Sequence, residues 1–204
     1  MLKGNVNFEP FNTERITTFD WDGFDVDISD EIGSGSHGKR SIQSGLKEFL
    51  EKRGDYSHIL FDHGSGEVAD FVTFKTDGSF IRVEFYHCKA KKGAGYNSNL
   101  ADVYEVAQQA VKSTVWLKSK ASLLSRIQNR IKGRKDSKFL RGDMRTLKEL
   151  LKSQRAMEVT IYIVQPAISK GKPMSDSFGK VLSAAAFYIR HTGRAKELMI
   201  LGSK

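Results

Sequence analysis

Two short stretches decide the fold of this chain: Gly66-Glu67-Val68-Ala69-Asp70 and Val83-Glu84-Phe85-Tyr86-His87-Cys88-Lys89. Both belong to runs that are rich in β-forming residues, and the turn Thr76-Asp77-Gly78-Ser79 lies between them. Two such runs joined by a glycine-containing turn predict a β-hairpin. The hairpin would bring the acid at the head of one strand, Asp70, close to the lysine at the tail of the next, Lys89.

The side chains of a strand alternate between its two faces. One face of the later strand is therefore predicted to carry Val83, Phe85, His87 and Lys89, and the other Arg82, Glu84, Tyr86 and Cys88. His87 and Lys89 leave the sheet together at the strand end, where open α/β sheets form ligand sites. With Asp70 they supply a carboxylate, a second type of metal ligand and a cation, which metal-dependent phosphodiester cleavage requires. The alternative is an ordinary hairpin end with surface residues.

Length and composition bound the class of protein. The chain has 204 residues, enough for one domain with a core, and 39% hydrophobic residues with 13 Phe are typical of a soluble globular protein. No apolar run approaches the roughly 20 residues of a membrane span, and the N-terminus lacks the apolar stretch of a signal peptide. The single cysteine, Cys88, excludes a disulfide framework and is expected to be a small buried hydrophobe. We expect a cytoplasmic protein without membrane contact.

The positive charge of the chain is concentrated in one block. The net charge is +9, but residues 112–155 alone carry fourteen basic and three acidic side chains. A concentration of this size indicates binding of a polyanion, most often nucleic acid. The alternative is a solubilising surface.

The chain divides into two parts by composition. Residues 1–38 are an acidic, aromatic N-terminal segment that ends in the linker Gly33-Ser34-Gly35-Ser36-His37-Gly38, with one or two edge strands expected within 16–28. Residues 39–204 are predicted to form one α/β domain.

Periodicity within 39–204 predicts alternating helices and strands. Helices are expected at 41–52, 100–117, within 121–153 and at 181–190, and strands at 58–61, 68–74, 80–88, 159–165 and 198–201. Pro166 is expected to end the strand 159–165. The order predicts a mixed central β-sheet flanked by helices.

This order, with Asp70 on the second strand and Lys89 ending the third, resembles the PD-(D/E)XK nuclease superfamily. The resemblance implies a restriction-endonuclease-like core in which Asp70 matches the motif's Asp and Lys89 its Lys. The family usually has Glu or Asp two residues before the Lys, where this chain has His87. A neutral imidazole brings no negative charge, so Mg²⁺ is expected to bind more weakly there than Mn²⁺.

Further motifs are similar to nuclease-like domains at the C-terminal end of bacterial DEAD/DEAH-box helicases in defence and restriction loci. They are Ser41-Ile42-Gln43, Gly64–Asp70, Phe85–Lys89, Val103–Val106, Gln109 and Ile163–Pro166, and they span roughly 39–204. The resemblance implies a metal-dependent nuclease. An endonuclease is the favoured type, and DNA is favoured over RNA as its substrate. It also implies a helicase domain in the same chain or in a partner, and Mg²⁺ or Mn²⁺ as cofactor.

The same resemblance implies the remaining site residues. Asp70 and His87 would hold the metal with help from Glu67, and Lys89 would orient water or stabilise developing charge. Gln109, on the helix after the third strand, and Gln43, on the first helix with Glu48 as second choice, would position water or phosphate. Asp62 and His63 are expected to be turn residues. The residues expected to hold the nucleic-acid backbone are Lys91, Lys92, Lys112, Arg126, Arg130, Arg134, Arg141 and Lys170.

Two other functional classes stay open. The chain could be a nucleic-acid-binding module of the same fold that has lost its metal through His87. It could also be an interaction domain that docks on a helicase through residues 1–32. No Walker-type phosphate loop and no Gly-x-Ser-x-Gly motif occurs in the sequence, which argues against an ATPase and against a serine hydrolase.

Overall fold

The computed structural model describes residues 10–33, 38–93, 99–191 and 193–204. Residues 1–9, residues 34–37 of the predicted linker, and residues 94–98 and 192 lie outside this range. The described strands are β1 (Ile16–Thr18), β2 (His58–Asp62), β3 (Phe71–Asp77), β4 (Phe80–Cys88), β5 (Ser137–Arg141), β6 (Ala156–Ser169) and β7 (Glu197–Ser203). The helices are α1 (Ile42–Lys52), α2 (Leu100–Ser113), α3 (Lys120–Gly133), α4 (Met144–Lys152) and α5 (Asp176–His191), with short 3-10 turns η1 (Thr13–Arg15) and η2 (Thr114–Lys118).

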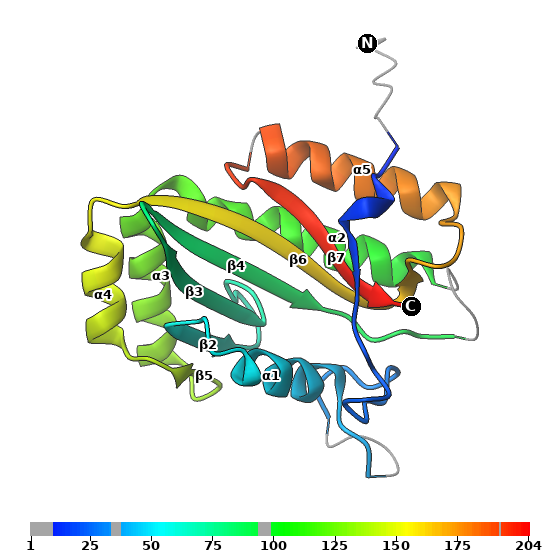
Figure 1. Ribbon diagram of the computed structural model, residues 1–204, viewed down its shortest axis with the longest axis horizontal. Helices are drawn as coiled ribbons and strands as arrows, with labels where there is room; N and C mark the ends of the chain where they lie inside the picture. The colour runs from blue at the N-terminus through cyan, green and yellow to red at the C-terminus, as the bar shows by residue number, and fades with distance from the viewer. Residues whose placement is uncertain (1–9, 34–37, 94–98, 192) are drawn as a thin grey trace.

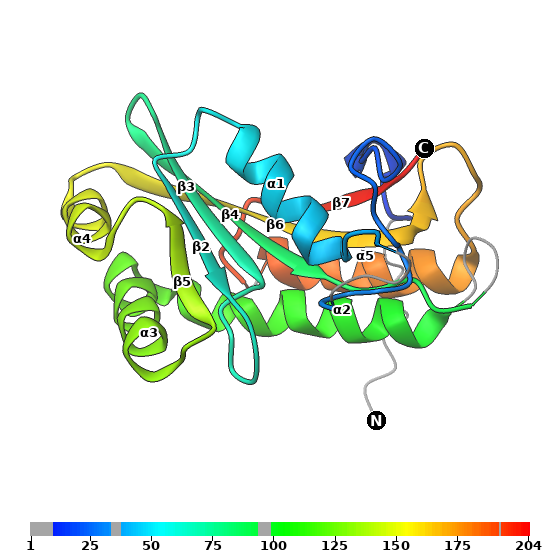
Figure 2. The same cartoon turned by 90° about the horizontal axis from the view of Figure 1, so that it is seen from below.

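The strands form one mixed sheet in the order β1-β7-β6-β4-β3-β2-β5. β4, β6, β7 and β1 are parallel, whereas β3, β2 and β5 pair antiparallel to their neighbours. Helix α1 covers one face of the sheet and α2 with α5 the other, while α3 and α4 lie beside β5 (Figures 1 and 2). The predicted class, a mixed α/β sheet flanked by helices, is confirmed.

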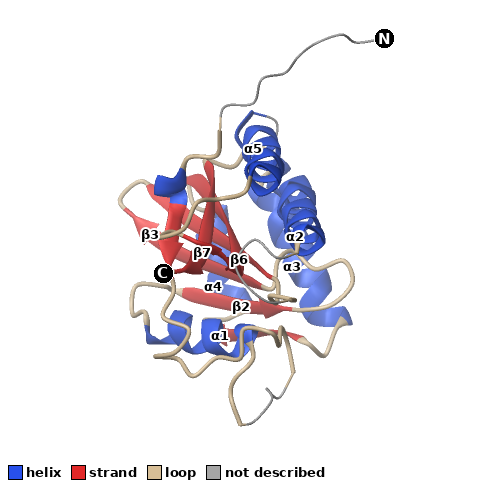
Figure 3. Ribbon diagram, turned by 90° about the vertical axis from the view of Figure 1, so that its right-hand side faces the viewer, coloured by secondary structure: helices blue, strands red, loops and turns tan. Residues whose placement is uncertain are grey.

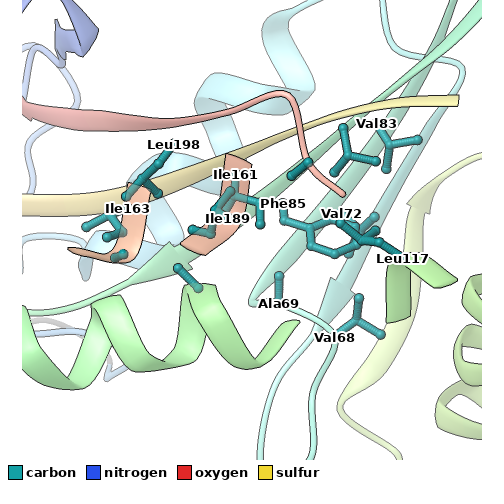
Figure 4. Close-up of a cluster of buried hydrophobic side chains, with 14 of the residues drawn as sticks. Val68, Ala69, Val72, Val83, Phe85, Leu117, Ile161, Ile163, Ile189 and Leu198 are labelled. Carbon is teal, nitrogen blue, oxygen red and sulfur yellow. The ribbon is translucent and has the colours of Figure 1, made fainter. Parts of the chain in front are cut away.

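Two hydrophobic clusters hold the layers together. The larger joins the sheet to α2, α3, α4 and α5, and the smaller joins it to α1 and the N-terminal segment. The alternation predicted for β4 is confirmed, because Val83 and Phe85 belong to the larger cluster and Tyr86 and Cys88 to the smaller. Figure 4 shows Val83 and Phe85 gathered with Val72 of β3 and Leu117 of η2. The tail of β4 therefore presents His87 and Lys89 toward α2.

Helix α1 begins as the sequence predicts. Ser41 is its N-cap, and the Ser41 hydroxyl accepts a hydrogen bond from the Ser44 backbone N–H at 3.3 Å. The predicted edge strand within 16–28 is present as β1, which pairs parallel with β7. Residues 10–33 also place Phe19, Trp21 and Val26 in the smaller core cluster.

Three expectations about the strands were wrong. The second strand of the hairpin region begins at Phe71 instead of residue 68, because residues 63–70 form a loop. The edge strand β5 was not expected. Pro166 does not end its strand: β6 continues to Ser169, and the register with β7 shifts between Val164 and Ser169. Proline is tolerated at such an irregularity, where a ladder hydrogen bond is already missing.

The described residues contain no helix that combines the length and the apolar character of a membrane span.

The close approach of β7 to the end of β6 generates a stability prediction. A Cβ added at Gly202 would overlap the Ile168 carbonyl oxygen, which is backbone and cannot rotate away. We expect Gly202→Ala to lower the free energy of unfolding by roughly 1–3 kcal/mol in urea titrations. Gly171→Ala is the matched control, because a Cβ there would lie 3.6 Å from the Lys204 carbonyl carbon, which is an ordinary van der Waals contact. Equal stability of the two variants would contradict the packing argument.

Candidate active site

The loop of residues 63–70, between β2 and β3, is held by a buried ion pair. The Asp62 carboxylate, at the end of β2, is fully buried and accepts hydrogen bonds from Arg130 Nε at 2.6 Å and from the Val68 backbone N–H at 2.8 Å. The Arg130 guanidinium also donates to the carbonyl oxygens of Ser65 at 2.8 Å and His63 at 3.0 Å. Helix α3 therefore fixes the path of the whole loop.

The loop gathers three potential metal ligands. One ligand atom each from His63, Glu67 and Asp70 lies within 4.8 Å of the others. His63 Nδ1 is 3.4 Å from Asp70 Oδ1 and 3.8 Å from Glu67 Oε2. Carboxylate oxygens suit Mg²⁺ and Mn²⁺, and an imidazole nitrogen suits Mn²⁺ and later transition metals better than Mg²⁺. The arrangement is able to hold a divalent cation.

The Asp70 side chain is fixed from two sides. Its Oδ1 accepts a hydrogen bond from Gln43 Nε2 of α1 at 2.6 Å, and its Oδ2 accepts one from the Cys88 backbone N–H at 2.8 Å. The predicted proximity of Asp70 to the tail of β4 is therefore present. Gln43 acts through Asp70, because its amide orients the carboxylate toward the loop.

The cluster holds two carboxyl groups close together in a largely buried place. Burial, together with the charge of Asp70, raises the pKa of Glu67 to about 8. The hydrogen bond to Asp70 raises the pKa of His63 above its usual range. Two carboxylates held this close repel each other unless a proton or a cation lies between them. A bound divalent cation would relieve that repulsion.

Four buried polar atoms beside the cluster have no hydrogen-bond partner among the described residues. They are both ring nitrogens of His87 and the Oε1 atoms of Gln43 and Gln109. Buried polar groups are almost always satisfied, so each such atom points to a missing partner. Burial lowers the pKa of His87 to about 4, so its imidazole is neutral at physiological pH and its lone pair is available.

Two of these side chains, His87 and Gln109, line a cavity of about 450 Å³ between the 63–70 loop, the tail of β4 and α2. His87 and Gln109 are in its wall with Glu67 and Asp70, and Lys112 and Trp116 lie at the side of α2 and η2. The structure thus brings together Asp70, His87, Gln109 and Glu67 as predicted. His87 is outside the compact group of three, which contains His63 in its place.

Lys89 lies between two acids. Its Nζ donates to Glu105 Oε1 of α2 at 2.8 Å and lies 3.2 Å from Glu31 Oε2. Burial lowers the pKa of Lys89, but the hydrogen bond to Glu105 and the charge of Glu31 outweigh it, so the pKa is raised and the amine stays charged. Glu31 also lines the cavity.

Sequence reasoning missed His63 and Glu31. The only signal for His63 was its distance of seven residues from Asp70, which means little without the loop geometry. Glu31 comes from the N-terminal segment, which was assigned to a separate part of the chain. Asp62 was expected to be a turn residue but is the last residue of β2 and is buried against Arg130, and His63 belongs to the cluster. Glu48, the second choice to Gln43, pairs with Lys52 at 2.7 Å instead.

The eight predicted nucleic-acid-binding residues do not lie together on one surface. Arg126 and Arg134 donate to carbonyl oxygens of the 63–70 loop, and Lys112 is exposed at the cavity. Lys91 and Lys92 lie two and three residues after Lys89, in the loop that follows β4.

Three of the predicted basic residues do not fit a nucleic-acid surface at this site. Arg130 is buried and saturated by the loop, as described above. Arg141 donates to carbonyl oxygens at the C-terminal end of α1, including Glu51 O at 2.5 Å, and so has a structural role. Lys170 is beside Glu14 at 3.9 Å and does not line the cavity.

Comparisons of the chain with protein-family models, with curated proteins and with solved structures found no match.

The buried ion pair yields a prediction about the loop. Arg130→Met would leave the Asp62 carboxylate buried without a counter-charge, and we expect it to lower the free energy of unfolding by about 3–5 kcal/mol. Arg134→Met is the matched control, because Arg134 is exposed and makes one long contact to the loop at 3.4 Å. Urea denaturation of both variants tests the difference, and equal stabilities would refute the role of Arg130.

The raised pKa of Glu67 yields a prediction with a defined pH window. Without metal, the folded state disfavours the ionised form of Glu67. The protonated Glu67 side chain is therefore compatible with folding at low pH, and stability falls as pH rises from about 4.5, the pKa in the unfolded chain, to about 8, the pKa in the folded protein. Glu67→Gln keeps an acceptor for the Gly64 backbone N–H but removes this loss. In chelator, we expect the variant to be more stable than wild type by roughly 2–4 kcal/mol at pH 8.5 and by little at pH 4.

Urea denaturation at the two pH values measures this difference. The exposed acid Glu14 serves as the control, and Glu14→Gln should show no comparable gain. A Glu67→Gln variant no more stable than wild type at pH 8.5 would contradict the electrostatic account of the cluster.

Proposed function

We propose that this protein is a divalent-metal-dependent nuclease whose active site is the cavity at the tail of β4. One observation carries the proposal: three clustered ligands and the partnerless nitrogens of buried His87 converge in one cavity, which Lys112 also lines and whose Glu31 pairs with Lys89. The order α1-β2-β3-β4-α2, followed after η2, α3, β5 and α4 by β6 parallel to β4, supports the resemblance to the PD-(D/E)XK superfamily.

The ligand set fits a divalent ion. Asp70, Glu67 and His63 would hold it, and His87 would present a neutral nitrogen from the tail of β4. When bound, such an ion polarises a phosphate oxygen and lowers the pKa of a water molecule. Two histidines beside two carboxylates favour Mn²⁺ over Mg²⁺.

The chain's own residues supply the rest of the chemistry. Gln43 and the Cys88 N–H fix the Asp70 carboxylate, so that it needs no rearrangement on binding. Lys89 holds a positive charge beside the cavity, where it can stabilise the negative charge that develops on phosphorus oxygens. The Gln109 Oε1 atom can accept a hydrogen bond from water, which orients that water for attack.

His87 also favours a second candidate function. A catalytically degenerate module of the same fold would keep the basic surface and lose the metal, because a neutral buried imidazole replaces the family's acid. In that case the protein binds nucleic acid without cutting it, and His87→Glu creates Mg²⁺-dependent cleavage.

The central test is a cleavage assay on plasmid, linear duplex, single-stranded DNA and RNA, with Mn²⁺, Mg²⁺ or chelator. We expect Mn²⁺-dependent cutting that falls at least about 100-fold in Lys89→Gln while binding in chelator is retained. Asp70→Asn should lose cutting as well.

The matched control is Lys75→Gln. Lys75 is a lysine of β3 that also pairs with a carboxylate, because its Nζ lies 2.8 Å from Asp55 Oδ2. This variant should cut like wild type. Undiminished cutting by Lys89→Gln would refute the role of Lys89 in cleavage. Metal-independent binding of nucleic acid without any cutting would favour the degenerate module.

A further inference from the structure

Exposed apolar side chains gather on one face of the molecule, formed by α2, η2 and α5. Of the six large hydrophobic side chains exposed among the described residues, four belong to these three elements: Tyr104 (50%), Val115 (45%), Phe187 (49%) and Tyr188 (42%). Helices α2 and α5 lie side by side on the sheet (Figures 1 and 3). Such a concentration on one face of a monomer marks a binding surface.

This face is hollowed, and its hollows connect to the candidate active site. One hollow of about 440 Å³ lies between Tyr104 of α2 and Tyr188 of α5. A second, of about 690 Å³, shares Val111, Lys112 and Tyr188 with it. Lys112 and Val115 of the second hollow also line the cavity that contains Asp70. We call the two hollows together the helical groove.

The sequence explains why the groove forms. Residues four apart share a helix face, so Tyr104, Gln108 and Lys112 follow one stripe of α2. On α5 the same spacing aligns Lys180, Ala184 and Tyr188. The small side chains between the tyrosines, including Ala184, leave the space that larger residues would fill.

The charge of the groove points to its occupant. The lining includes four cations, Lys112, Lys118, Lys180 and Arg194, and no acidic residue among the described residues that line either hollow. Aromatic rings exposed between cations are the pattern that binds single-stranded nucleic acid, because bases stack on the rings while cations hold phosphates. Paired bases in a duplex are already stacked and offer no free face to these rings.

We propose that the helical groove binds single-stranded DNA or RNA and leads it to the candidate active site. Bases stack on Tyr104 and Tyr188, and Lys112 and Lys180 hold the backbone. The direction of the strand toward the cavity rests on the proposed nuclease function, whereas the binding itself does not. The inference therefore names the substrate class of that site as single-stranded nucleic acid.

Binding in chelator tests the groove apart from catalysis. Fluorescence anisotropy of the full chain would use labelled oligo-dT and oligo-rU of about 20 nucleotides, and a duplex of the same length. We expect tighter binding to a single strand than to the duplex. Tyr104→Ala and Tyr188→Ala should each weaken single-strand binding on the order of tenfold, and Tyr→Phe variants should retain it.

Two further variants sharpen the result. Lys180→Gln should reduce the slope of log affinity against log salt by about 0.7. Phe80→Ala removes an exposed aromatic residue from the β3–β4 hairpin, outside the groove, and should bind like wild type.

Several results would overturn the groove. One is equal single-strand binding by wild type and by the variant that carries both Tyr104→Ala and Tyr188→Ala (the double tyrosine variant). Another is tighter binding to the duplex than to the single strand. The third is self-association of the protein that Tyr104→Ala abolishes, which would make this face a protein interface. Metal-dependent cutting of single strands at wild-type rate by the double tyrosine variant would refute the groove and leave the nuclease standing. Tyrosine-dependent binding without cutting under any metal would support the groove and refute the nuclease.

Discussion

The buried pairing of Asp62 with Arg130 is the constraint on which the candidate site depends. It joins the end of β2 to α3 and uses the remaining guanidinium donors to fix the carbonyl groups of the 63–70 loop. A buried ion pair gives little net stability, because desolvation offsets the attraction, but its geometry is specific. Here that geometry holds His63, Glu67 and Asp70 together despite the repulsion between their carboxylates.

The fold was largely predictable because its core strands and helices carry strong local patterns. The alternation along β4 and the Ser41 cap of α1 needed no tertiary information. The misses have physical causes. β5 is a short edge strand with Lys138 and Arg141, so no apolar run marks it. Pro166 would end a regular strand, but the register shift with β7 removes the hydrogen bond that proline cannot make.

The candidate site was predictable mainly where a residue lies on a regular element or directly beside one, as Asp70 does before β3. Asp70, His87, Gln43 and Gln109 follow from strand ends and helix faces, and the structure brings them to one place. His63 required the shape of a loop fixed by α3, and Glu31 required knowledge of how a distant segment packs. The number of basic residues in a segment does not predict which of them are accessible to a ligand. Arg130 is buried in an ion pair inside the protein, whereas Lys112 is exposed.

Lys89 has a consequence for how the chain can be divided. Its amine lies between Glu31, which precedes α1, and Glu105 on α2, and the Glu31 carbonyl oxygen accepts a hydrogen bond from the Gln43 backbone N–H at 3.1 Å. Residues 10–33 also supply β1 and part of the core under α1. The change of composition after residue 38 therefore does not coincide with a boundary between separately packed parts of the structure. A polypeptide beginning at residue 39 would keep every residue of the recognisable motif and yet have a different charge balance around its lysine.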